Sequence, residues 1–331
     1  MILSNSFKNS FLKIYKLFSK NTFFLSLLIL IVAIIYIVIN VKKNINNLEL
    51  FTIGFSSKLI PFLMLVFIFQ FLNWILEAIK FKILLPSKER LPFFMILKAV
   101  YVGNLTALIT PKRMGNFIGR SMILKKYTNK IVVSTISGNF IQLFTTLLMA
   151  FSSFLYLSIF KIEYIYLLDS FITELIIIYG TVLIIFYFLI FNNQWYSIIN
   201  KIIPLKYLNQ QVNYLKSISS KKRFYVILMS ISRYLVFIFQ YYILFNGLML
   251  SFDFLETTIL ISLLFGIVTF LPSLAPGNLG TREAISILLL GGTIVSIKFS
   301  IISFLVWFFN VAISGFIGGL ILFYKKGWSW K

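Results

Sequence analysis

Long runs of apolar residues alternate with short polar segments along the chain. Six runs are at least twenty residues long, and at about 1.5 Å per residue each can cross the roughly 30 Å hydrocarbon core of a bilayer as a helix. The first run lacks the small-residue cleavage site of a signal peptide and follows a polar segment, residues 1–21. We predict membrane-spanning helices at residues 22–41, 59–79, 131–160, 171–191, 224–245 and 299–324.

Two further apolar runs stop at a proline where a spanning helix would continue. Each is followed by a segment of about twelve residues, which as a helix is about 18 Å long and too short to cross. Proline breaks a helix, and glycine permits the turn. We therefore predict two re-entrant helical hairpins, residues 92–125 and 257–292. Their predicted turn residues are Pro111, Gly115, Pro276, Gly277 and Gly280.

The charge pattern favours the hairpins over eight simple spans, which is the alternative topology. With the N-terminus in the cytoplasm, twenty of the 31 Lys and Arg residues fall inside, five fall outside and six fall within the membrane region. Eight simple spans divide them much more evenly, against the positive-inside rule. The preferred topology places residues 1–21 and the C-terminus in the cytoplasm. The two hairpins then enter from opposite sides, as in an inverted repeat.

The composition agrees with this fold class and excludes chemistry that depends on Cys or His. Of the 331 residues, 60% are hydrophobic and 12% are charged, which indicates one all-α polytopic domain, residues 1–331, in the cell (inner) membrane. With no Cys and no His, the chain lacks disulfides, thiolate nucleophiles, histidine bases and ordinary zinc or haem ligands. We predict no cofactor and no metal. The net charge of +22 is explained by orientation signals, and we predict no nucleic-acid partner.

The candidate chemistry lies in the charged and amide residues of the membrane region. Arg113, Asn116 and Arg120 share one helical face of the first hairpin, and guanidinium groups suit a phosphate or carboxylate. The alternative is that these arginines snorkel to the membrane surface.

The other candidates lie in the second hairpin and in the spans and arms beside the hairpins. Glu283, beside Arg282, could bind a substrate cation, take up a proton, or form a structural ion pair with Arg282 or Arg233. Charge inside a span is costly, which marks Glu77 and Arg233. Lys98 is a candidate partner for Glu77. We predict substrate binding by Arg113, Asn116, Arg120, Arg282, Glu283, Arg233, Glu77 and Lys98.

The two hairpins carry motifs that resemble those of a known family. The first motif reads Pro111-Lys112-Arg113-Met114-Gly115-Asn116, followed by Arg120, and the second reads Pro276-Gly277-Asn278-Leu279-Gly280-Thr281-Arg282-Glu283. The chain is similar to the lysylphosphatidylglycerol synthase transmembrane region, a flippase-like family. Its members usually have Glu where this chain has Asn116. The resemblance implies a role in moving lipids or polyprenyl-linked intermediates between leaflets, without the aminoacyl-transferase domain of the synthases.

The predicted function is therefore lipid translocation, with an anionic phospholipid or polyprenyl-phosphate-linked lipid as the partner. Two alternatives stay open at this point. One is a polyprenyl-phosphate-dependent membrane enzyme, and the other is a non-transporting assembly subunit. A homo-oligomer or a membrane-enzyme partner is compatible with each of them.

Overall fold

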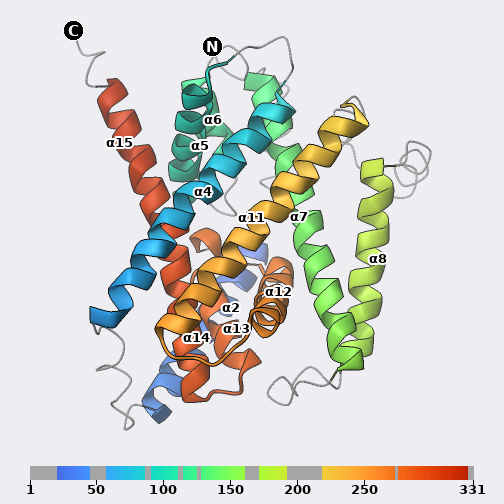
Figure 1. Ribbon diagram of the computed structural model, residues 1–331, viewed down its shortest axis with the longest axis vertical. Coiled ribbons are helices and arrows are strands. Elements are labelled where there is room, and N and C mark those ends of the chain that lie inside the picture. The colour runs from blue at the N-terminus through green and yellow to red at the C-terminus, as the bar shows by residue number, and fades with distance from the viewer. Residues whose placement is uncertain are drawn as a thin grey trace.

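The computed structural model describes most of the chain, and every regular element in that part is a helix (Figure 1). The described stretches are residues 21–44, 57–85, 91–110, 115–124, 128–160, 171–191, 218–272 and 275–326. The long helices are α2 (Asn21–Asn44), α4 (Ile60–Leu84), α7 (Thr128–Ile159), α8 (Ile172–Phe191) and α11 (Ser220–Gly247). The shorter elements are η1 (Ser57–Leu59), α5 (Phe93–Leu108), α6 (Asn116–Ile123), α12 (Phe254–Phe270), η5 (Pro276–Asn278), α13 (Thr281–Leu289), α14 (Ile294–Trp307), η6 (Phe308–Ile313) and α15 (Ser314–Lys326).

Five helices are long and apolar enough to cross a membrane, and they coincide with five of the six predicted spans. They are α2, α4, α7, α11 and the continuous helix that α14, η6 and α15 form together. The sixth predicted span is α8, whose 20 residues reach about 30 Å. Large apolar side chains such as Phe24, Ile68 and Phe316 are exposed on the outer faces, as lipid contact requires. The predicted all-α polytopic membrane fold is confirmed.

The first hairpin consists of α5 and α6, which pack closely because small residues separate them. A Cβ on Gly119 would collide with the carbonyl oxygen of Val102. The Thr106 hydroxyl lies between the arms, where it donates to the Gly115 carbonyl oxygen at 2.7 Å and accepts from the Gly119 N–H at 3.1 Å. Gly115 has an ordinary helical φ of −70°, so the close packing around it, rather than its backbone conformation, requires glycine.

The second hairpin consists of α12 and α13, joined by η5 and a tight turn. Gly277 and Gly280 have φ values of 63° and 83°, which glycine adopts without steric cost. Both glycines lie in the turn between α12 and α13. The indole of Trp307 donates to the carbonyl oxygen of Pro276 at 2.7 Å, and this bond holds the turn against α14.

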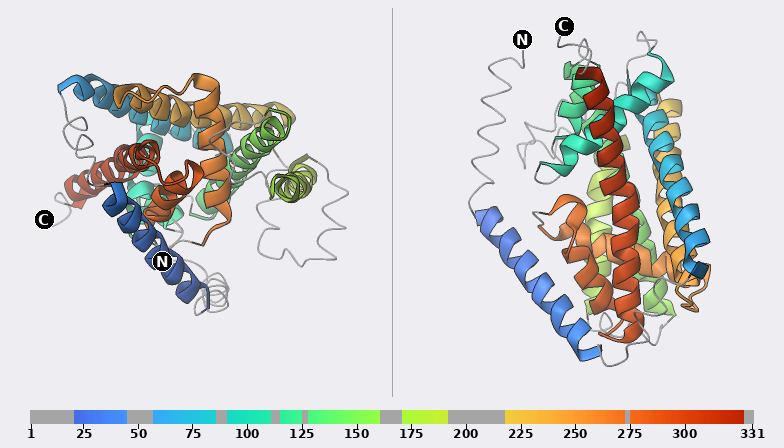
Figure 2. Two further views of the ribbon diagram at one scale, coloured as in Figure 1. Left: turned by 90° about the horizontal axis from the view of Figure 1, so that it is seen from below. Right: turned by 90° about the vertical axis from the view of Figure 1, so that its left-hand side faces the viewer.

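The two hairpins lie at opposite ends of the bundle (Figures 1 and 2). α5 and α6 lie at the end where α4 finishes and α7 begins, whereas α12 and α13 lie at the end where α11 finishes and α14 begins. Both pack against the last long helix, α5 against α15 and α13 against α14. Each hairpin therefore returns to the end from which it started. Their re-entrance in a bilayer and the inverted repeat stay predictions.

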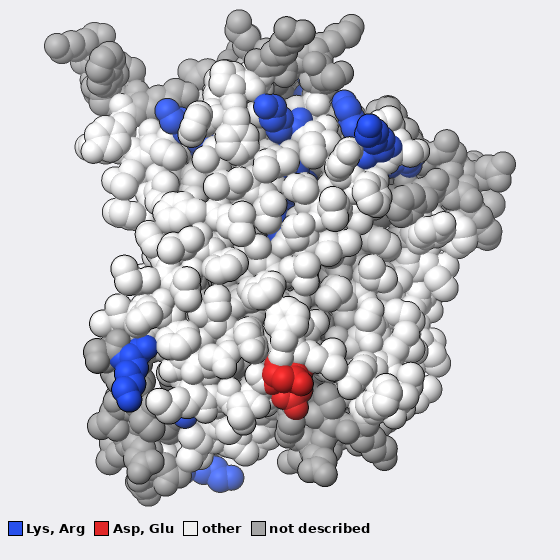
Figure 3. All heavy atoms as spheres, viewed as in Figure 1, with Lys and Arg blue, Asp and Glu red and all other residues white. Residues whose placement is uncertain are grey.

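Charged side chains are visible near both ends of the bundle (Figure 3). On the face shown, Lys and Arg lie near the end that holds α5 and α6 and also near the other end, where the visible acidic atoms lie. Asp253 and Glu256 form a capping box at the start of α12, where each carboxylate accepts the backbone N–H of the other residue.

Candidate substrate-binding site

A polar stripe runs along the buried face of α4, although the helix is otherwise strongly apolar. Its members repeat at three- and four-residue intervals, which places them on one side of the helix. All are buried: Gln70, Asn73, Trp74, Glu77 and Lys80. A carboxylate inside a spanning helix is costly unless it is paired, so the partners of Glu77 define the site.

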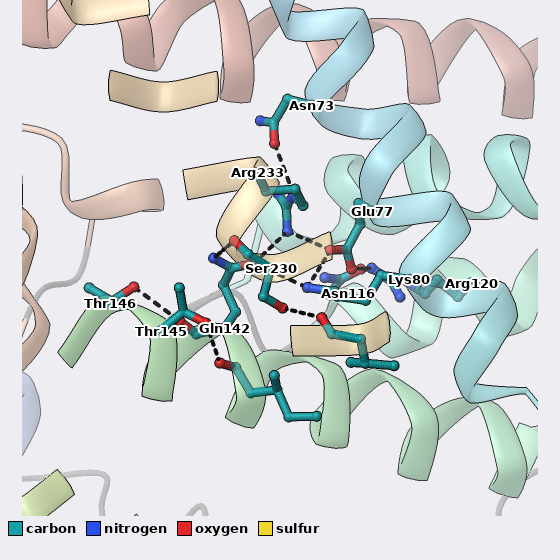
Figure 4. A network of polar contacts seen from close by, with 12 residues as sticks. Asn73, Glu77, Lys80, Asn116, Arg120, Gln142, Thr145, Thr146, Ser230 and Arg233 are labelled. Carbon is teal, nitrogen blue, oxygen red and sulfur yellow. Dashed lines mark hydrogen bonds and ion pairs between the residues drawn. The ribbon is translucent and has the colours of Figure 1, made fainter. Parts of the chain in front are cut away.

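Glu77 lies at the centre of a cluster of three cations (Figure 4). One oxygen, Oε1, accepts from Arg120 Nη2 at 2.8 Å, and the other, Oε2, contacts Arg233 Nη1 at 2.5 Å and Lys80 Nζ at 2.7 Å. The side chains are 1% exposed for Lys80 and Arg120, 4% for Glu77 and 10% for Arg233. Three helices, α4, α6 and α11, therefore meet at one carboxylate.

The first hairpin places Arg120 in this cluster. Residue 120 lies one turn after Asn116 on α6, and Arg120 Nε donates to Asn116 Oδ1 at 3.0 Å. The guanidinium lies 4.4 Å from the ring centroid of Phe81 on α4, which provides a cation–π contact. Both contacts fix the orientation in which Arg120 reaches Glu77.

Arg233 enters the cluster from α11. Its Nε donates to Asn73 Oδ1 at 2.8 Å, and its guanidinium lies 5.3 Å from the Trp74 ring centroid. On α7, Gln142 Oε1 accepts from Lys80 at 3.2 Å and from Arg233 at 3.4 Å. Neutral acceptors on two helices therefore supplement the single carboxylate.

A chain of buried amides extends from Arg233 into the last helix. Asn73 Nδ2 donates to Asn310 Oδ1 at 2.8 Å, Asn310 Nδ2 donates to Gln240 Oε1 at 2.8 Å, and Gln240 Nε2 donates to the Val66 carbonyl oxygen at 3.1 Å. Asn310 lies in the π-helical segment η6, and such segments often occur at functional sites. The amide chain connects the charged cluster to the helix on which both hairpins pack.

The second hairpin carries its own buried ion pair. Arg282 Nη2 donates to Glu283 Oε1 at 2.8 Å and to the Ser303 carbonyl oxygen at 2.6 Å. The other oxygen of Glu283 accepts the Gly280 N–H at 2.6 Å, so this carboxylate also caps its own helix. Both oxygens of Glu283 are thus occupied within the hairpin, as in the ion-pair alternative predicted for it.

Both charged groups contribute residues to the lining of one cavity of about 710 Å³. Asn116 of the first hairpin and Gly277, Asn278 and Arg282 of the second line it, together with Glu77 and Arg233. Apolar side chains from α11, α12 and the last helix cover much of the remaining wall. The exposed side chains of α7 and α12 among its lining residues, Asn139 and Phe270, show where the cavity reaches the surface of the bundle.

Residues 23–319 match the lysylphosphatidylglycerol synthase TM region, a family of membrane domains. The chain belongs to this family. The matched segment begins in α2 and ends in α15, so it contains both hairpins and the cavity between them. The family membership predicted from the two motifs is confirmed. No curated protein and no solved structure matches the chain.

Six of the eight predicted binding residues surround this cavity. Four of them line it directly: Glu77, Asn116, Arg233 and Arg282. The other two form ion pairs with lining residues, Arg120 with Glu77 and Glu283 with Arg282. Arg113 and Pro111 lie outside the described residues. The prediction that Lys98 pairs with Glu77 is wrong, because Lys98 is exposed on α5 and other cations surround the carboxylate.

Two residues of the site are not among the eight predicted binding residues. Lys80 follows the helical spacing of Glu77 but also fits a cytoplasmic orientation charge, and in the structure it is 1% exposed and bound to Glu77. Trp74 carried no charge to mark it, although its spacing of three residues from Glu77 places both on one helical face. Lys80 and Trp74 each lie three residues from Glu77, and this helical spacing is the feature of the sequence that indicates them.

Proposed function

We propose that the protein translocates an anionic phospholipid or a polyprenyl-phosphate-linked lipid between the leaflets of the cell membrane. The observation that supports this most strongly is the cavity to which both hairpins contribute, with Arg233 and Arg282 in its lining. Buried guanidinium groups bind phosphate oxygens well, and apolar walls suit the part of the lipid next to the headgroup.

The arrangement of the hairpins suggests how a headgroup could be transferred. One hairpin packs at each end of the bundle, and each contributes residues to the same cavity. A shift of either hairpin relative to the other would open the cavity toward one leaflet at a time, as in transporters with broken helices. The hydrocarbon chains would stay in the surrounding lipid while the headgroup moves through the polar interior.

The proposal is tested by leaflet exchange in vesicles. Purified protein is reconstituted with lipids that carry a fluorophore on an acyl chain, and a membrane-impermeant reductant measures the fraction reached from outside. We expect faster exchange of anionic lipid with the protein than in protein-free vesicles. Arg233→Gln should slow it by about tenfold, since a hydrogen bond to a charged group contributes roughly 1.5–3 kcal/mol.

Lys98→Gln is the matched control, because it also removes one cation from an apolar helix but leaves the cluster intact. Equal loss in both variants would contradict a specific role for the site. Absence of exchange for every anionic lipid, beside a working reference translocase, would refute the proposal itself.

A membrane enzyme at this cavity would need a free carboxylate as its base. Of the residues described there, Glu77 is the only acidic one in the lining, and three cations already occupy it. A genetic experiment distinguishes the assembly-subunit alternative from translocation. A phenotype that is lost on deletion but preserved in Arg233→Gln would favour assembly, whereas loss in both would favour translocation.

A further inference from the structure

The cluster around Glu77 carries more positive charge than its own carboxylate can neutralise. Lys80, Arg120 and Arg233 face a single Glu77, which leaves two positive charges in excess. The second ion pair, Arg282 with Glu283, is neutral by itself. No other carboxylate of the described residues lines the cavity. Uncompensated charge in a buried site is strongly unfavourable, so an anion that enters the cavity is stabilised by this excess.

Two hydrogen-bond donors at the cavity also lack acceptors. Trp74 Nε1 and Arg282 Nε are buried and have no hydrogen-bond partner among the described residues. Both belong to residues that line the cavity, one on α4 and the other on α13. A buried donor without an acceptor is unfavourable, so a ligand rich in acceptor oxygens that reached either donor would be stabilised.

From these two observations we infer that the site selects a doubly negative phosphate monoester headgroup, and that Lys80 supplies the charge that distinguishes it from a singly negative phosphodiester. This inference rests on the proposed translocation. A phosphate monoester carries up to two negative charges and three terminal acceptor oxygens. Two excess cationic charges match that headgroup, whereas a phosphodiester leaves one of them unpaired.

The same charges disfavour headgroups that contain an ammonium group. Such a group needs a free carboxylate, but Glu77 already contacts three cations and both oxygens of Glu283 are occupied within the hairpin. Aminoacylated and ethanolamine lipids should therefore be poor substrates of this chain. Lipid-linked phosphate is favoured over free phosphate because apolar side chains such as Phe237, Phe265 and Val306 line much of the cavity.

The test compares four acyl-labelled lipids in the same vesicles: phosphatidic acid, phosphatidylglycerol, phosphatidylethanolamine and phosphatidylcholine. At pH 8 we expect phosphatidic acid to exchange about tenfold faster than phosphatidylglycerol, because one extra charge at close range has an effect of this order. Lys80→Gln should reduce that ratio to about one, whereas Lys98→Gln should leave it unchanged. Excess glycerol 3-phosphate should not inhibit exchange.

A pH series tests the inference without any variant. The second ionisation of a phosphate monoester lies near pH 6, so the preference for phosphatidic acid should disappear at pH 5. Within the cluster, acidification can only add protons to Lys80 or Glu77, since the guanidinium groups of Arg120 and Arg233 stay charged. Such protonation strengthens anion binding, so a lost preference would arise from the headgroup.

The outcomes separate this inference from the proposed function. Equal exchange of phosphatidic acid and phosphatidylglycerol at every pH would overturn the selectivity and leave translocation standing. Strong inhibition by glycerol 3-phosphate would assign the site to a soluble phosphate and overturn the lipid source. Movement of none of the four lipids, beside a working reference translocase, would refute translocation as well.

Discussion

Replacement of Glu77 by Gln should destabilise the protein severely, although the side chain keeps its shape. Among the described residues, Glu77 is the one carboxylate that these three cations contact, at distances of 2.5, 2.7 and 2.8 Å, and the change removes it. Breaking a single buried ion pair by removing one partner costs about 3–5 kcal/mol, because the remaining charge stays buried. Here the excess rises from two positive charges to three, so we expect a loss at or above the upper end of that range.

The loss is measured as the unfolding midpoint of purified protein in detergent or nanodiscs. A change of 1 kcal/mol corresponds to about 2–4 °C for a domain of 150–250 residues, so Glu77→Gln should lower the midpoint by roughly 10 °C. The matched control is Glu174→Gln, the same substitution at an exposed residue in the first turn of α8. Equal midpoints for the two variants would refute the assignment of Glu77 as the centre of the cluster.

The same unfolding assay measures the coupling between Glu77 and Arg120 of the first hairpin. Arg120→Gln alone removes a cation that is 1% exposed and leaves two cations on Glu77. The double variant Glu77→Gln, Arg120→Gln should be more stable than the sum of the single changes predicts, because directly paired groups couple by about 0.5–3 kcal/mol. Strict additivity would show that α6 does not deliver Arg120 to this carboxylate.

Two further predictions concern the packing and the topology of the hairpins. Gly119→Ala should abolish lipid exchange and lower the unfolding midpoint, because the added Cβ would collide with the Val102 carbonyl oxygen. The control is Gly319→Ala, in which the nearest neighbour of the added Cβ would lie at 3.9 Å, so this variant should behave as wild type in both assays. The chain has no native cysteine, so single cysteines can be labelled with a membrane-impermeant maleimide. Lys126→Cys should react from the cytoplasmic side and Val295→Cys from the opposite side. Labelling of both variants from the same side would contradict the hairpin topology.

The long helices and the hairpin breaks could be predicted because each depends on local sequence. A run of twenty apolar residues specifies a span, and Pro followed by Gly specifies where a helix stops. The end of α4 was harder to place. The prediction stopped at residue 79 because a lysine follows, but the helix continues to Leu84 with Lys80 buried. A lysine at a membrane surface and one that binds a buried carboxylate look identical until the partner is known.

The pairing of charges could not be predicted for the same reason. The cost of charge inside a span marks Glu77 and Arg233, yet the sequence favours Lys98 on α5 as the partner of Glu77, whereas the structure has Arg120 on α6. The difference arises from helix rotation, since the packing of Gly103 against Asn116 and Arg120 turns α6 toward the cluster. Rotation depends on contacts between segments, which a single sequence does not reveal.

The last long helix explains why a site can form between two hairpins that start at opposite ends. α13 packs against its first part, α14, and α5 packs against its last part, α15. The π-helical segment η6 lies between these two contacts and contains Asn310, whose amide bonds reach Asn73 and Gln240. A π segment locally changes helical register, so it directs Asn310 toward the cluster without ending the helix. One continuous helix thereby fixes both hairpins and the polar interior relative to one another.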